Sequence, residues 1–397
     1  MNLGVLLIPL VTGLIGWITN ALAIRMIFWP LKRFGWKALS WQGVLPANVD
    51  RMATICVGLM TSKLIDEQAI FKRIEPGRIS ALLAPALEEH AEQIVEGVLA
   101  RRFPRIWKAV PDAVWDKTRV RLRAEIPSII KKMMADLHDD LGHFLNLESL
   151  VVNAFSSNRM LLNKLFWKCG SKEFKFIEYS GLLFGSLFGL VQMLVWIFAQ
   201  PVWFLPITGV AVGWATNWLA LKMVFEPLEP KKIGPVNWQG LFLRRQDEVS
   251  EAYAEFFATK ILHSEALMNS ILEGPAAEQL IELLKEYVEE SVDHVSGAAG
   301  TIAQLTVGTD KWLDLKAEIS GRIALVVPHE LGKLQDYVSE AIALEEELCR
   351  NLKSLNSAEF EEVLRPVFRE DESTLIAVGA ALGGVAGLLQ FLLMTLL

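Results

Sequence analysis

The sequence predicts an all-α integral membrane protein, and its composition, its long charge-free runs and its helical periodicity lead to that prediction. The chain has 397 residues, of which 52% are hydrophobic and 21% charged, fewer charged residues than the ~25% typical of soluble domains. Its mean hydropathy of +0.33 is correspondingly high. The net charge of −7 provides no overall basic field, so nucleic acid is not an expected partner.

Four runs are long and apolar enough to cross a bilayer, over residues 3–25, 177–199, 203–223 and 375–397. The first has no charged residue from Leu3 to Ala23. A helix of about 21 residues reaches about 31 Å, which matches a hydrocarbon core of about 30 Å. No cation precedes this run, and the run exceeds the ~7–15 apolar residues of a signal peptide core. We therefore expect a retained span.

The connection between the second and third spans contains Gln200-Pro201. Proline removes a backbone donor and disfavours helix in the residue before it, so this dipeptide predicts a tight hairpin between the two spans.

Two polar segments of about 150 residues, 28–176 and 226–374, separate the spans. Apolar residues recur in them at helical spacing, as Leu82, Leu83 and Leu87 do. Prolines at 104, 111 and 127, and at 275 and 328, are expected to divide them into successive amphipathic helices. Two interpretations remain open: the apolar faces form the core of a helical bundle, or some of them line a groove for acyl chains or lie on the membrane surface.

Lysines and arginines cluster at both ends of each polar segment, whereas the connection between spans two and three has none. The positive-inside rule then predicts that both segments are cytoplasmic and both termini outside. The flanking cations are Arg25, Lys32, Arg33 and Lys37; Lys164, Lys168, Lys172 and Lys175; Lys222, Lys231 and Lys232; and Arg365 and Arg369.

The chain contains an internal repeat. Residues 16–31 read GWITNALAIRMIFWPL and residues 213–228 read GWATNWLALKMVFEPL, with ten identities in sixteen positions at a separation of 197 residues. The same separation aligns Trp41-Gln42-Gly43 with Trp238-Gln239-Gly240. We predict two tandem modules, 1–199 and 200–397, each a span, a cytoplasmic segment and a span. An even number of spans per module makes them parallel repeats about an axis along the membrane normal.

The first of these strings, followed by Gly43-Val44-Leu45-Pro46 and Asp50-Arg51-Met52-Ala53, resembles the YheB/YjiN family, a domain of unknown function in bacterial membrane proteins. The second copy departs from the pattern with Leu243 where the first has Pro46. The resemblance implies a helical protein of a bacterial inner membrane and no particular reaction.

Each copy carries a polar pair inside its first span, Thr19-Asn20 and Thr216-Asn217. Polar side chains in a span are costly unless they are partnered, so they mark either a hydrogen bond between packed helices or a path for a solute or proton. Arg25 and Lys222 follow where these spans emerge.

Acidic residues precede the second span of each module, at the same predicted depth as these cations. We expect Arg25 to pair with Glu173 or Glu178, and Lys222 with Asp371 or Glu372. The alternative is that both cations extend to the lipid headgroups.

A stripe of small residues lies along the second span of each module at helical spacing, which is typical of closely packed membrane helices. The stripes are Gly181, Gly185, Gly189 and Gln192, and Gly379, Gly383, Gly387 and Gln390.

No catalytic, cofactor or metal motif is recognisable. The three cysteines are far apart, and His138 and His143 are too far around a helix to share a metal. The sequence therefore favours a non-catalytic membrane protein that handles or organises membrane lipid through its cytoplasmic helices. The alternative is a small-solute or ion translocator that uses the Thr-Asn pairs. A homo-oligomeric or protein partner bound through the cytoplasmic helices is left open.

Overall fold

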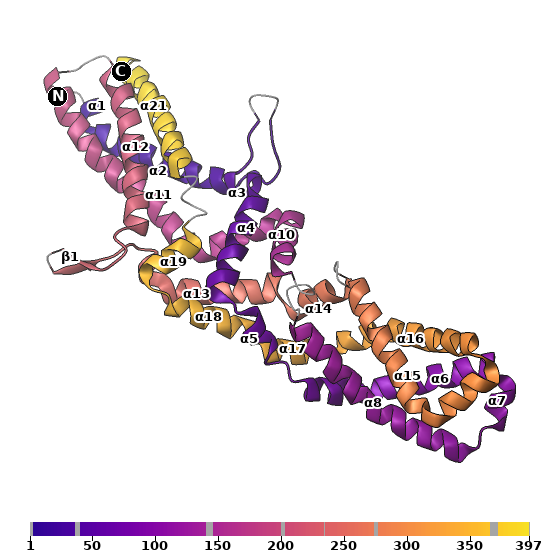
Figure 1. Ribbon diagram of the computed structural model, residues 1–397. Coiled ribbons are helices and arrows are strands. Elements are labelled where there is room, and N and C mark those ends of the chain that lie inside the picture. The colour runs from indigo at the N-terminus through magenta and orange to yellow at the C-terminus, as the bar shows by residue number, and fades with distance from the viewer. Residues whose placement is uncertain are drawn as a thin grey trace. The chain divides into compact units, whose positions relative to one another are not determined.

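The computed structural model describes residues 3–35, 40–139, 146–199, 203–233, 235–273, 277–365 and 372–396 (Figure 1). Helices make up almost all of the regular structure in these ranges. The exception is the antiparallel hairpin of β1 (Lys231–Ile233) and β2 (Val236–Trp238). The chain divides into two compact units. Unit 1 comprises residues 1–64, 151–260 and 345–397, and unit 2 comprises residues 65–150 and 261–344.

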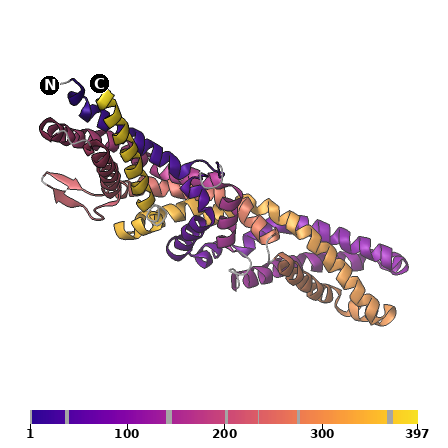
Figure 2. The same cartoon turned by 90° about the horizontal axis from the view of Figure 1, so that it is seen from above.

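Four helices of unit 1 are long and apolar enough to cross a membrane, which confirms the predicted all-α membrane architecture. They are α2 (Ile8–Phe28), α11 (Arg159–Ala199), α12 (Phe204–Phe225) and α21 (Glu372–Leu396), with the short α1 (Leu3–Leu6) before them. They lie side by side, with α2 packed along α11 and α12 along α21 (Figures 1 and 2). In both views α1 lies at the same end of this bundle as the end of α21.

The ends of these helices differ from the predicted spans. Helix α2 continues to Phe28 and stops just before Trp29-Pro30, because proline has no amide hydrogen to extend the helix. Helix α11 starts at Arg159, so the second span is the end of a longer helix of 41 residues. The expected Gln200-Pro201 turn lies outside the described residues.

The rest of unit 1 consists of short helices packed on the extension of α11 around a core of aromatic residues that includes Phe155, Tyr253 and Phe257. Their bounds are α3 (Val44–Ala47), α4 (Val49–Leu59), the π-helix η2 (Met60–Leu64), α10 (Leu147–Ser157), the 3₁₀-helix η3 (Leu243–Arg245), α13 (Gln246–Phe256), the π-helix η4 (Phe257–Ile261), α18 (Leu344–Ser354) and α19 (Ser357–Leu364).

The loops that follow α2 and α12 fold back in the same way. The Gln42 side-chain amide donates to the Leu31 carbonyl at 2.8 Å, and that of Gln239 donates to the Leu228 carbonyl at 2.9 Å. The glycine after each glutamine donates its amide to a proline carbonyl, at 2.9 and 3.0 Å. Both loops are thereby tied back to the residues that leave the preceding span.

Unit 2 is built around four long helices, α6 (Pro76–Arg102), α8 (Asp112–Asp139), α15 (Ala277–Val307) and α16 (Thr309–Leu331), which run alongside one another (Figure 1). The shorter elements are α5 (Glu67–Phe71), α7 (Pro104–Ala109), α14 (Ser264–Glu273), the 3₁₀-helix η5 (Gly332–Leu334) and α17 (Gln335–Ile342). Their apolar faces form a core that includes Leu83, Ile130 and Leu284.

The expected division by prolines is correct at 104 and 111, which bound α7, and wrong at two other positions. Pro127 lies inside α8, and Pro328 lies inside α16 three residues before its end. A proline removes one helical hydrogen bond, and in both helices the packing of the apolar face on neighbouring helices outweighs that loss. Pro275 lies outside the described residues.

Candidate functional site

Asn20 and Asn217 hold the spanning helices together in pairs. The Asn20 side-chain amide donates to the Ile177 carbonyl of α11 at 2.7 Å. The Asn217 amide donates to the Leu375 carbonyl of α21 at 2.9 Å. Both asparagines are buried, so each bond satisfies a donor that would otherwise be costly in the membrane.

Thr19 and Thr216 bond within their own helices. The Thr19 hydroxyl donates to the Gly16 carbonyl at 3.0 Å, and the Thr216 hydroxyl to the Gly213 carbonyl at 3.3 Å. Both threonines are buried. Of each predicted Thr-Asn pair, only the asparagine therefore bonds across to another helix.

The two asparagines line one small cavity of about 30 Å³, together with apolar residues and Glu173. That volume accommodates one or two water molecules. The Asn20 side-chain oxygen is buried and has no hydrogen-bond partner among the described residues. Asn20 and Asn217, one from each repeated string, thus line the same cavity. The sequence did not show this.

The glycine stripes lie where spanning helices touch. A Cβ atom on Gly181 would overlap the Gly16 carbonyl, and one on Gly379 would overlap the Asn217 amide. The other stripe glycines meet the facing backbone in the same way: Gly185 and Gly189 lie against Thr12 and Pro9, and Gly383 and Gly387 lie against Gly209 and Leu205. Only glycine allows backbones to approach this closely.

Gln192 bonds across three spanning helices. It accepts a hydrogen bond from the Thr12 hydroxyl of α2 at 2.9 Å and donates to the Thr208 hydroxyl of α12 at 2.7 Å. Gln390, its counterpart in the repeat, is also buried. The sequence analysis missed Thr12 and Thr208, because isolated threonines in an apolar run give no signal of their partners.

The ion pairs expected between Arg25 and Glu173 or Glu178 do not form. Arg25 lies on an exposed face of α2, and its side chain has no ion-pair or hydrogen-bond partner among the described residues. Glu173 pairs with Arg245 in place of Arg25, and Glu178 forms no ion pair in the described part of the chain. The reason is that the loop after α12 brings the unpredicted Arg245 directly against α11.

In the second copy, unlike the first, the cation has an acidic residue close to it. Lys222 lies 3.6 Å from Glu226, one helical turn further on, and stacks over the Trp218 ring at 5.0 Å. Glu372 contacts Arg365 at 3.6 Å in place of Lys222. The other expected partner, Asp371, lies outside the described residues.

Arg245 is the centre of an ion-pair network at the end of the span in α11. Its Nη1 atom contacts both Glu173 carboxylate oxygens at 2.6 Å, and its Nε and Nη2 atoms donate to Glu248 at 2.9 and 2.8 Å. Lys172 donates to Glu248 at 2.7 Å. These hydrogen bonds from Arg245 and Lys172 lower the pKa of Glu248 from 4.5 to about 2.

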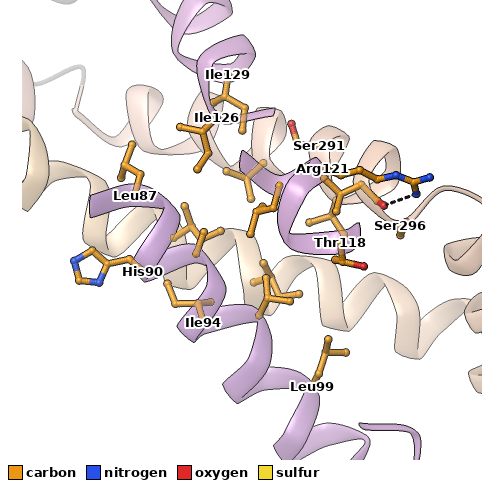
Figure 3. Close-up of a pocket in the computed structure, with 18 of the residues that line it drawn as sticks. Leu87, His90, Ile94, Leu99, Thr118, Arg121, Ile126, Ile129, Ser291 and Ser296 are labelled. Atoms are coloured by element: carbon orange, nitrogen blue, oxygen red, sulfur yellow. Dashed lines mark hydrogen bonds between the residues drawn. The ribbon is translucent and has the colours of Figure 1, made fainter. Parts of the chain in front are cut away.

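A cavity in unit 2 has a volume of about 390 Å³ and lies among α6, α8, α15 and α16 (Figure 3). Its wall is aliphatic and aromatic, and includes Leu87, Ile94, Ile126 and Trp115. Leu83 and Leu87, singled out from the sequence, line it, whereas Leu82 is exposed on the same helix and does not. The lining on α6 runs from Leu83 to Leu99, about 24 Å of helix.

Polar groups are few around this cavity. Figure 3 shows Arg121 with its guanidinium hydrogen-bonded to the backbone, where Nη1 donates to the Val295 carbonyl at 3.3 Å. Lys117, also in the wall, is exposed. His90 is a further residue of the wall, and its imidazole lies 3.5 Å from the carboxylate of the buried Glu330. An apolar space with a few cations beside it suits a long apolar ligand with an acidic end.

The described residues do not form a metal site. They contain no group of three or more His, Cys, Asp or Glu side chains placed to hold a metal ion. Cys56 is buried, and desolvation raises its pKa to about 12, so its thiol stays protonated and is a poor nucleophile. The side chains of His138 and His143 lie outside the described residues.

Comparison with known proteins finds relatives among bacterial membrane proteins. The chain is 30% identical over 198 residues to a UPF0754 membrane protein of Shouchella clausii, covering 44% of this chain and 51% of the relative. It is 29% identical over 159 residues to one of Picosynechococcus sp., covering 34% and 38%, and 29% identical over 134 residues to one of Synechococcus elongatus, covering 32% of each.

The chain thus spans about half or less of the length of these curated relatives. No family model matches the chain. No solved structure matches it either. The chain is similar to bacterial membrane proteins of a family of unknown function, and the relatives' printed names state no ligand or reaction.

Proposed function

We propose that this protein is a non-catalytic membrane protein that handles lipid by holding an acyl chain in the cavity of unit 2. The observation that carries the proposal is this cavity of about 390 Å³, which aliphatic and aromatic side chains line along more than four turns of α6. An acyl chain is long, thin and without hydrogen-bonding groups, and so matches an elongated apolar space.

The proposal includes the location of the protein. The cations at the span ends support a bacterial inner membrane in which both polar segments are cytoplasmic and both termini outside. The repeated string supports membership of the YheB/YjiN type with two tandem modules. The matching bonds of Asn20 and Asn217, and of Gln42 and Gln239, are consistent with that duplication.

The first experiment measures binding of a fluorescent fatty acid to the full-length protein in mild detergent. Val114 lines the cavity and Val120 does not, and both are on α8 with 44% and 67% of their surface exposed. Val114→Glu puts a carboxylate in the apolar wall and should weaken binding about tenfold. Val120→Glu should leave it within about twofold.

A second matched pair checks the wall that α6 contributes. Leu87→Gln alters the lining of α6, whereas Leu82→Gln changes an exposed residue of the same helix. Circular dichroism establishes that each variant folds. If Val114→Glu and Leu87→Gln bind the fatty acid as tightly as the wild type, then the cavity does not hold it and the proposal is wrong.

A small-solute or ion translocator is the second candidate, favoured by the cavity that Asn20 and Asn217 share. Two asparagines around a space of about 30 Å³ can hold water between the spanning helices. The scarcity of charged side chains inside the four apolar spans counts against a path for large or multiply charged solutes.

Proteoliposomes that contain a pH-sensitive dye test this second function. A translocator should raise proton or potassium flux above that of protein-free vesicles. Asn20→Leu and Asn217→Leu should each reduce the flux at least tenfold, whereas Ile18→Leu, on the exposed face of α2, should not. Wild-type flux equal to that of empty vesicles would exclude translocation of these ions.

A further inference from the structure

A second cavity lies in unit 1, beside the ion-pair network of Arg245. It has a volume of about 320 Å³ and is lined by Lys172, Glu173, Phe176, Leu241, Arg244 and Arg245. We refer to these six residues as the basic cleft. It contains three cations and one carboxylate, with two apolar side chains as its remaining wall, so its charge is positive.

The cations of the basic cleft differ in how they are held. Arg245 is only 17% exposed, and Glu173 and Glu248 occupy its guanidinium. Lys172 is exposed and pairs with Glu248. Arg244 is exposed, and its side chain has no ion-pair or hydrogen-bond partner within the described ranges. The guanidinium of Arg244 is thus uncompensated, whereas the neighbouring guanidinium of Arg245 is already paired with two carboxylates.

The basic cleft lies at the depth of lipid headgroups. Glu178 is the last charged residue of α11 before its apolar run to Ala199. Lys172 and Phe176 precede it by six and two residues, or about 9 and 3 Å along the helix axis. Each headgroup layer of a bilayer is about 5–7 Å thick. The cleft therefore extends from the headgroup layer at Phe176 to just beyond that layer at Lys172, in the leaflet into which α11 enters.

We propose that the basic cleft binds the phosphate of an anionic phospholipid headgroup, with Arg244 as its main ligand. A guanidinium presents two parallel N–H donors to phosphate oxygens, and it keeps its charge at any physiological pH. Lys172 adds a second cation on the same side. Phe176 and Leu241 provide an apolar wall for the glycerol and the first carbons of the acyl chains. The inference is independent of the acyl cavity in unit 2.

The test is native mass spectrometry of the full-length protein released from nanodiscs of phosphatidylglycerol and phosphatidylcholine in equal amounts. The wild type should retain phosphatidylglycerol preferentially. Arg244→Gln should reduce that retention about fivefold, the effect of removing one cation near a membrane surface. Arg159→Gln is the matched control, because Arg159 is an exposed arginine of the same unit, at the start of α11 and thirteen residues before Lys172.

Lys172→Gln provides a second variant and should lower retention in the same direction. Equal retention by the wild type, Arg244→Gln and Lys172→Gln would overturn the proposal. So would an equal loss in Arg159→Gln, because it would indicate general attraction of the surface to anionic lipid. Release of the lipid by millimolar inorganic phosphate, in the wild type and not in Arg244→Gln, would assign the cleft to free phosphate instead.

Discussion

Asn20 and Asn217 show how a neighbouring glycine makes a helical carbonyl accessible. In α11 the Ile177 carbonyl already faces the amide of residue 181, its helical partner four residues on. That residue is Gly181, and a Cβ atom there would lie 2.7 Å from the Asn20 side-chain nitrogen. The absence of a side chain at 181 therefore lets Asn20 reach the carbonyl as a second donor.

A single carboxyl group should give the protein a measurable acid sensitivity. The pKa of Glu248 is about 2 in the folded chain and 4.5 for an unperturbed group. Because the folded value is the lower one, the stabilisation is complete above about pH 4.5 and is lost as the pH falls towards 2. Glu248 is half exposed, so solvent screening limits its contribution to about 1 kcal/mol.

We therefore expect Glu248→Gln to melt at a lower temperature than the wild type at pH 7, and the difference to shrink as the pH falls from 5 to 3. Thermal unfolding in detergent, followed by circular dichroism, measures both. Added salt should also narrow the gap, because screening weakens the bonds with Arg245 and Lys172. A gap that stays constant across this pH range would mean that the carboxylate charge is not what stabilises the fold.

At the scale of the element, pairs of spanning helices depend on backbone contact. Gly16 and Gly213 face the carbonyls of Gly181 and Gly379, and a Cβ atom at either would overlap that oxygen. The amides of Asn20 and Asn217 lie one helical turn further on. Separating the helices would lengthen these hydrogen bonds as well, so the glycines and asparagines act together.

Gly16→Ala and Gly213→Ala should each destabilise the protein by about 1–3 kcal/mol, because the facing backbone must move away. Gly58→Ala is the matched control: this glycine lies in α4 of the same unit, with nothing within 4 Å of an added Cβ atom. There the substitution should stabilise by about 0.5–1 kcal/mol, since alanine favours helix. Denaturation in a detergent series measures all three, and equal effects would refute the contact.

The apolar faces of unit 2 show that an element can serve two purposes. Leu83 is buried in the core and also lines the cavity. The helical period predicted one apolar face with Leu82, Leu83 and Leu87, and the structure corrects this prediction for Leu82, which is exposed. The period did not show that the four long helices leave a space between them, because cavity volume depends on how side chains from different helices meet.

At the scale of the whole molecule, we predict that four spans put the two polar segments on one side of the membrane. A cysteine-free protein with single cysteines at Ser62, Ser354 or Trp203, all exposed positions, tests this in intact cells. An impermeant maleimide should label Trp203→Cys directly, and Ser62→Cys and Ser354→Cys only after the membrane is permeabilised. Labelling of Ser62→Cys and Ser354→Cys from opposite sides would refute the topology.

The compact units do not follow the order of the chain. Unit 1 takes in both ends and the middle of the sequence, and unit 2 takes one stretch from each half. A cut at the predicted module boundary, between residues 199 and 200, would therefore divide both units. Each half of the chain carries helices whose apolar faces are covered by the other half within the same unit.

The sequence by itself determined the helical class, the four spans and the small-residue faces along them. These follow from local properties: the length of an apolar run, the absence of charge and a spacing of four residues. Gln192 and the glycines of each stripe were recognisable in this way. The ends of the spans were harder to recognise from the sequence, since α11 continues without a break into charged sequence.

Only the tertiary structure decided which groups meet. It gave Glu173 to Arg245 in place of Arg25, joined Thr12 and Thr208 through Gln192, and brought both asparagines to one cavity. The partners in these contacts come from helices that are distant in the chain. The energy of an ion pair or hydrogen bond depends on the distance and burial of its atoms, and a sequence of residue types specifies neither until the helices are packed.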